Sequence, residues 1–241
     1  MDNSYAWYDS NSLHLRNELQ LFRRIILNHP GNVCIDIGAH FGYFSRGIAE
    51  IIAGTNRKLI CLEPDKINFS CLKKTMGQLP KKCIIELLPF ALNNIDDEIE
   101  MYESDTSCKH TYKDTDVAFT VSYKVKGVSL DTLVLRKLES CDKIAFIKVD
   151  IDGSEAALFS GGIETLRKHK PILFIEFSPF MIRKSGQDPE KYFSMLNQEF
   201  HVYWYTNYRL KKVASSDFCV IEQNVKNGIT DLLLSYSEYL S

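Results

Sequence analysis

Two acidic residues, each at the end of an apolar run, are the first sign of chemistry in this sequence. Asp36 ends one run and is followed by Gly38 and Gly42, and Glu63 ends a second run 21 residues beyond Gly42. In an open α/β sheet, neighbouring strand ends form the crevice that binds a small cofactor, and an acid at the second strand accepts the hydroxyls of a ribose. The pair therefore predicts a ligand that contains a nucleoside.

The glycine pattern narrows the identity of that ligand. Dinucleotide-binding turns read G-x-G-x-x-G, because a pyrophosphate must reach the helix N-terminus. Here His40 and Tyr43 replace the second and third glycines, which favours a ligand without a phosphate, such as S-adenosylmethionine. In that arrangement Asp36 lies near the cationic methionine end, Gly38 offers its carbonyl, and Glu63 binds the ribose.

A second acidic cluster follows the apolar run at residues 143–149. Asp150, Asp152 and Glu155 lie within six residues of one another. Lys148 shares a strand face with Asp150, and because buried lysines are rare unless paired, it is expected to contact a carboxylate. Two interpretations stay open: the acids stabilise the start of the next helix, or Asp150 lies beside a methyl donor while another acid is a general base or metal ligand.

Further candidates lie elsewhere in the chain. Glu176 interrupts an apolar strand predicted at residues 171–177, and His110 lies in a polar loop at residues 104–116. His40 is expected near the ligand through its backbone. The candidate bases, in order of preference, are Asp150, Glu155, Glu176 and His110.

Alternating strands and helices predict a doubly wound, mostly parallel sheet whose functional loops share one rim. An N-terminal helical segment at residues 1–30 is expected before a single domain at residues 31–241, with residues 104–116 as an insertion between paired strands. The expected strands are 32–36, 58–62, 83–88, 97–103, 117–125, 143–149, 171–177, 201–205 and 218–221, and the expected helices are 12–29, 43–52, 66–79, 129–138, 153–159, 162–168 and 189–199.

Composition limits the classes of partner. The net charge of −2 gives no electrostatic case for binding nucleic acid or an anionic membrane, so a small-molecule partner is expected. No apolar stretch approaches the roughly 20 residues that span a bilayer, and we expect no signal peptide. The seven cysteines include no C-x-x-C pair, which favours reduced thiols and a cytoplasmic location. The oligomeric state stays open.

Taken together, these motifs resemble the FkbM family of S-adenosylmethionine-dependent methyltransferases. The resemblance covers roughly residues 30–180, with His40 where the family usually has Asn and Asp152 where it usually has Glu. It implies a Rossmann-like class I methyltransferase fold, with a mostly parallel seven-stranded sheet, an antiparallel last strand and helices on both faces. It also implies O-methylation of a hydroxyl on a sugar or natural product. The residues that carry it are 36–44, 62–65, 91–92, 128–133, 147–155 and 175–176. The expected cofactor-binding residues are Asp36, Gly38, His40, Phe41, Gly42, Glu63, Pro64, Ala91 and Asp150.

Methyl transfer leaves two routes open for activating the acceptor. One of the candidate bases removes the hydroxyl proton, or a divalent metal such as Mg²⁺, held by Asp150, Asp152 or Glu176, lowers the hydroxyl pKa. Three other functions compete with methyl transfer: an NAD-dependent oxidoreductase, a non-catalytic protein that binds adenosylmethionine, and transfer of another group, such as aminopropyl, from the same donor. The missing glycines count against the first.

Overall fold

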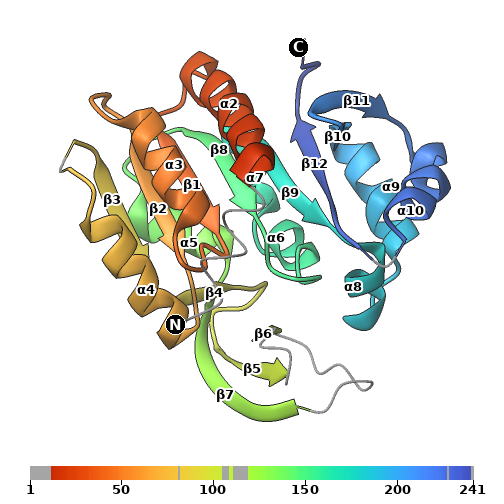
Figure 1. Cartoon of the computed structure of the whole chain (residues 1–241), viewed down its shortest axis with the longest axis horizontal. Coiled ribbons are helices and arrows are strands. Elements are labelled where there is room, and N and C mark those ends of the chain that lie inside the picture. The colour runs from red at the N-terminus through yellow and green to blue at the C-terminus, as the bar shows by residue number, and fades with distance from the viewer. Residues whose placement is uncertain (1–11, 81, 105–108, 111–118, 227, 240–241) are drawn as a thin grey trace.

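The computed structural model describes residues 12–80, 82–104, 109–110, 119–226 and 228–239 of this 241-residue chain (Figure 1). The helices are α2 (Ser12–Asn28), α3 (Tyr43–Ile52), α4 (Lys66–Gly77), α5 (Leu130–Lys137), α6 (Ala156–Ser160), α7 (Ile163–His169), α8 (Pro179–Lys184), α9 (Pro189–Glu199), the 3₁₀ turn η1 (Ser215–Asp217) and α10 (Phe218–Val225). The strands are β1 (Val33–Ile37), β2 (Lys58–Leu62), β3 (Ile84–Leu88), β4 (Phe90–Leu92), β5 (Glu98–Ser104), β6 (Lys109–His110), β7 (Phe119–Val128), β8 (Ile144–Val149), β9 (Ile172–Phe177), β10 (His201–Thr206), β11 (Arg209–Val213) and β12 (Thr230–Ser235).

The main sheet has the strand order β11-β10-β12-β9-β8-β1-β2-β3. The five strands from β3 to β9 in this order are parallel, whereas β12 is antiparallel to both of its neighbours, β9 and β10. The mostly parallel sheet is therefore confirmed, and β10 runs in the same direction as β9. The carboxyl ends of β1, β2, β8, β9 and β10 and the start of β12 consequently meet at one rim.

The sheet has eight strands rather than the seven that we expected. The additional edge strand is β11, which pairs antiparallel with β10 through a two-residue turn. Asn207 and Tyr208 form this turn, with φ angles of 48° and 60°. Tyr208 stands where such turns usually have glycine, so turn propensity does not predict this hairpin.

The strand predicted at residues 218–221 is wrong, because this segment is the start of helix α10. Phe218 and Ile221 are buried while Val220 is 46% exposed. A spacing of three residues between buried positions places them on one face of a helix. The antiparallel strand near the C-terminus is β12 instead.

Helices cover both faces of the sheet (Figure 1). One apolar cluster joins Phe22 of α2 and Ile48 of α3 to Phe146 and Phe174 of the strands. The other face packs against α5, α6, α7, α9 and α10. Within α2, the ring of Phe22 lies 4.8 Å from that of Phe146 and 4.9 Å from that of Phe174. Helix α2 thus lies directly over β8 and β9.

The segment between β3 and α5 forms a second sheet, in the order β4-β7-β5-β6. The expected pairing of the two long strands is confirmed, since β5 and β7 run antiparallel. Most of the polar loop predicted at residues 104–116 lies outside the described residues, apart from Ser104 and the short strand β6.

Candidate active site

Charged residues form a row along the carboxyl ends of the main sheet. Asp36 of β1 pairs in register with Lys148 of β8. Further along, Asp231 of β12 lies between Glu176 of β9 and Tyr205 of β10. Side chains two residues apart share a sheet face, so the row lies on the same face as Phe146 and Phe174 and beneath α2. Asp36, Lys148, Glu176, Asp231 and Tyr205 therefore come from the five neighbouring strands β1, β8, β9, β12 and β10.

Lys148 supplies the positive charge at this row. Its Nζ lies 2.9 Å from Oδ2 of Asp150 and 4.0 Å from Oδ1 of Asp36, and 4.5 Å from the centre of the Phe44 ring. Burial alone would lower the pKa of Lys148, but the charges of Asp150 and Asp36 raise it above its ordinary value. The lysine is therefore a fixed cation, and the expected contact with a carboxylate is confirmed.

The Asp36 carboxylate is completely enclosed. Its Oδ2 accepts a hydrogen bond of 2.5 Å from the Ser45 hydroxyl, and its Oδ1 has no hydrogen-bond partner among the described residues. Burial raises the pKa of Asp36, while the nearby Lys148 opposes that rise. Asp36 therefore faces Ser45 and Lys148, and a direct contact with the cofactor stays a prediction.

The glycine turn after β1 fits tightly against the loop after β8. Gly38 has a φ angle of +78°, and a Cβ at this position would lie 1.8 Å from the carbonyl oxygen of Asp150. The amide of Gly38 donates to the carbonyl of Leu62 at 3.0 Å. Only glycine allows this backbone conformation without strain, so Gly38 lets the turn pack closely between the ends of β2 and β8. Gly42 also has a positive φ, of +87°.

Glu63 fastens the same turn to the end of β2. Its Oε2 accepts from the His40 amide at 2.8 Å, and its Oε1 accepts from the Asp65 amide at 3.0 Å and from the Asn68 side chain at 3.4 Å. Burial raises the pKa of Glu63 to about 7, although these hydrogen bonds act to lower it. A carboxylate offers about four acceptor positions, so these bonds leave capacity for a ribose hydroxyl.

The remaining expected cofactor contacts surround this turn. The rings of His40 and Phe41 lie 3.8 Å apart, and the carbonyl of Phe41 accepts a hydrogen bond from Thr75. Pro64 follows Glu63 directly and is half-buried, and Ala91 is buried on β4. Their contact with a cofactor stays a prediction.

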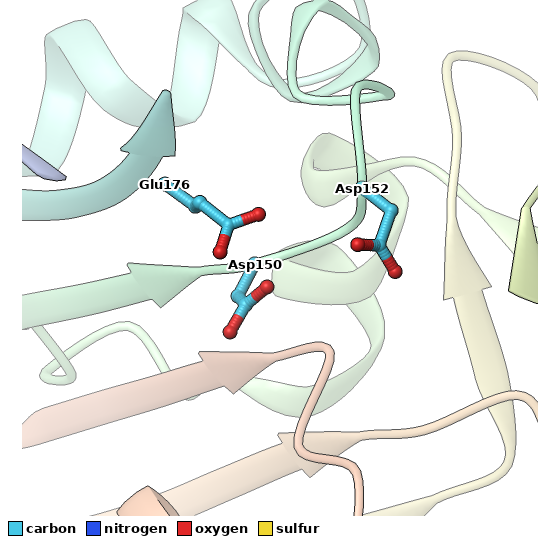
Figure 2. A group of neighbouring side chains, drawn as sticks. All are labelled: Asp150, Asp152 and Glu176. Carbon is cyan, nitrogen blue, oxygen red and sulfur yellow. The ribbon is translucent and has the colours of Figure 1, made fainter. Parts of the chain in front are cut away.

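Three carboxylates gather where β8 and β9 end. Asp150, Asp152 and Glu176 each offer an oxygen within 4.8 Å of the other two, and Figure 2 shows these side chains at the strand ends and the adjoining loop. Burial and the charge of Asp150 raise the pKa of Asp152 to about 7 and that of Glu176 well above its ordinary value. Such a group can hold a divalent cation or retain a proton among its members.

Glu155 braces the loop that carries these acids. It is buried, and its Oε1 accepts from the amides of Ile151 and Gly153, at 3.2 Å each. Burial raises its pKa to about 7. These contacts stabilise the loop before α6, whereas the Glu155 side chain makes no capping hydrogen bond to that helix. Its role as a base stays a prediction.

His110 belongs to strand β6 of the second sheet, where it pairs with Tyr102. Its side chain lies outside the described part of the chain. Its role as a base stays a prediction.

Sequence reasoning missed two acids, Glu18 of α2 and Asp231 of β12. Burial and the charge of Asp231 raise the pKa of Glu18 to about 8, and burial and Asp150 raise that of Asp231 to about 7. A signal for Glu18 was present, since it lies three residues after Leu15 and four before Phe22 on the apolar stripe of α2. Asp231 carried no such signal, because β12 was not expected.

Comparison with known protein families assigns the chain to one of them. The model of the FkbM methyltransferase domain matches residues 36–209, which is well over half of the chain. The chain belongs to the FkbM methyltransferase family. Glu18 and Asp231 both lie outside the part of the chain that the FkbM model matches. A comparison with curated proteins found no match.

Solved structures confirm the class I methyltransferase fold of this FkbM protein. The FkbM methyltransferase from Methylobacillus flagellatus KT superimposes with a TM-score of 0.50 at 17% identity, covering 85% of this chain and 43% of that one. The chain thus spans less than half of that protein's length. The O-methyltransferase TomG from Streptomyces achromogenes, solved with S-adenosylmethionine, gives a TM-score of 0.52 at 10% identity, covering 92% of this chain and 79% of that one. No helix in the described ranges is long and apolar enough to cross a membrane.

Proposed function

We propose that this protein transfers a methyl group from S-adenosylmethionine to a hydroxyl of a small molecule, a sugar or another natural product. The observation that carries the proposal is the bonding of Glu63 to the glycine turn and to the end of β2, which leaves one acceptor position of its carboxylate for a ribose hydroxyl. Membership in the FkbM family supports it, as does the likeness in fold to an O-methyltransferase solved with S-adenosylmethionine.

The residues at the rim suit each part of that cofactor. Glu63 binds the ribose hydroxyls, the backbone of Gly38 and His40 lines the turn, and Asp150 faces the methionine end. The carboxyl groups of the row offer oxygens that can accept hydrogen bonds from the ammonium group at the methionine end. Bound S-adenosylmethionine supplies an activated methyl group, and the protein supplies orientation and exclusion of water.

The acceptor hydroxyl is placed beside Asp150 and Glu176, where β8 and β9 end. Glu176 is the better candidate for receiving the proton, because Asp150 already pairs with Lys148 at 2.9 Å. The oxygen-rich group of Asp150, Asp152 and Glu176 also suits Mg²⁺. That ion would lower the pKa of a bound hydroxyl, so a metal-assisted route stays the alternative.

Turnover with a mixture of hydroxylated small molecules tests the proposal. Release of S-adenosylhomocysteine, together with the gain of one methyl group by a component of the mixture, would support it. Glu176→Gln is expected to slow turnover by at least tenfold while cofactor affinity is kept, and the exposed Glu190→Gln on α9 is the matched control. Cofactor binding without turnover on any hydroxylated component would favour the non-catalytic binding protein instead.

A further inference from the structure

A cavity opens beside the row of acids, between the β10–β11 hairpin and the start of β12. It has a volume of about 350 Å³ and is lined by Tyr205, Asn207, Tyr208 and Asp231, among others. Small-molecule sites usually have volumes of roughly 300–1,000 Å³, so this cavity is large enough for one ring of a ligand. None of the residues assigned to the cofactor lines it.

The cavity continues the row rather than standing apart from it. Asp231 belongs to both, since it lines the cavity and is the register partner of Glu176. Strand β9, which carries Glu176, is separated by two strand spacings, or roughly 10 Å, from β10, which leads into the turn with Tyr208. A molecule whose reacting hydroxyl lies beside Glu176 would therefore reach Tyr208 with a second ring, not with the ring that carries the reacting oxygen.

The lining chemistry indicates what that second ring is. Tyrosine rings offer flat apolar surfaces with a polar edge, while Asn207, Thr230 and Asp231 offer amide, hydroxyl and carboxylate groups. Of the described residues that line the cavity, none is basic, so phosphate and carboxylate groups gain no charge partner there. A neutral ring with apolar faces and many hydroxyls fits these groups best.

Tyr208, which lines the cavity, also has a strained backbone conformation. Tyr208 has a φ angle of 60° and is 50% exposed, although it lines the cavity. In a two-residue hairpin turn this position favours glycine, and a bulky residue there is strained. Strained residues cluster at ligand-binding sites, and here the strain places an aromatic ring at the mouth of the cavity.

We propose that this cavity binds the part of the methyl acceptor remote from the reacting hydroxyl, and that the acceptor is a neutral, hydroxyl-rich molecule of at least two rings, such as a disaccharide or a glycoside. The assignment rests on the proposed function, because it takes the reacting hydroxyl to lie beside Asp150 and Glu176. Binding energy from the remote ring would help to orient the reacting one.

The test uses the full chain saturated with S-adenosylhomocysteine, to which cellobiose, maltose and lactose are added and observed by saturation-transfer NMR. Glucose 6-phosphate is the anionic comparison. We expect at least one disaccharide to bind and the phosphate to bind less well. Tyr208→Gly is expected to weaken disaccharide binding at least fivefold, while its melting temperature is unchanged or raised, because glycine tolerates this conformation.

Lys170→Gly is the matched control, since Lys170 also has a positive φ, of 51°, but caps α7 and does not line the cavity. Its disaccharide binding is expected to match the wild type. Binding of S-adenosylhomocysteine with no disaccharide bound, or equal disaccharide binding by Tyr208→Gly, would overturn the assignment and leave the proposed function standing. Failure to bind S-adenosylhomocysteine would instead count against the proposed function.

Discussion

Glu18 is expected to make the ligand-free protein less stable as the pH rises. The side chain is 3% exposed, and burial together with the charge of Asp231 raises its pKa from 4.5 to about 8. Between these two values the unfolded chain has released the proton while the folded chain retains it. The folded state then binds more protons, so the free energy of unfolding decreases as the pH rises.

The size of this effect follows from the shift. Each pH unit in this range lowers the free energy of unfolding by about 1.4 kcal/mol. The decrease between pH 5.5 and 8 is therefore roughly 3 kcal/mol. Glu18→Gln keeps a neutral group of the same size and removes the titration. As the pH rises from 5.5 to 8, the free energy of unfolding of the variant is therefore expected to increase by roughly 3 kcal/mol relative to that of the wild type. For a chain of this length this difference corresponds to roughly 6–12 °C in melting temperature.

Urea denaturation of both proteins at several pH values measures the difference directly. Histidines with lowered pKa values, such as His29, titrate alike in both and cancel. Glu50→Gln, at an exposed position on α3, is the control and is expected to track the wild type. Parallel curves of stability against pH for wild type and Glu18→Gln would show that Glu18 does not hold its proton in the fold.

Two substitutions test the packing beneath the site, both by urea denaturation. Gly38→Ala is expected to lower the free energy of unfolding by at least about 2 kcal/mol, because its Cβ would lie 1.8 Å from the carbonyl oxygen of Asp150. The control, Gly54→Ala, should lower it less, because no atom lies within 4 Å of a Cβ at that position. Equal losses of stability would contradict the close approach at Gly38. Lys148→Met is expected to lower the free energy of unfolding by about 3–5 kcal/mol, because it leaves buried acids without their cation. Lys124→Met removes an exposed ion pair and is expected to lower it by less than about 1 kcal/mol. A small loss for Lys148→Met would show that the buried ion pair is not essential for stability.

Much of the fold could be predicted because its signals are local. The apolar runs ending in Asp36, Glu63 and Asp150 are strands buried on both faces, and each acid lies at the rim where parallel strands end. Alternating strands and helices then leave few arrangements of the sheet. The cofactor turn could be located for the same reason, since its glycines and acids lie within one strand-turn-helix unit.

The remainder depended on contacts between distant segments. Glu18 is one acid in a helix, and only the packing of α2 across β8 and β9 brings it to the row. Asp231 joined the row because β12 inserts between β9 and β10. Tyr208 adopts a left-handed backbone conformation that a bulky residue rarely takes, so turn propensity does not predict β11 or the cavity beside it.

Calorimetric titration of the full chain with S-adenosylhomocysteine tests the central claim most directly. We expect binding at one site, weakened roughly tenfold or more in Glu63→Ala, because a hydrogen bond to a charged acceptor contributes about 1.5–3 kcal/mol. Glu50→Ala, at an exposed position, is expected to bind like the wild type. No binding by the folded wild-type protein, or equal affinity in Glu63→Ala, would contradict the placement of the cofactor at the ends of β1 and β2.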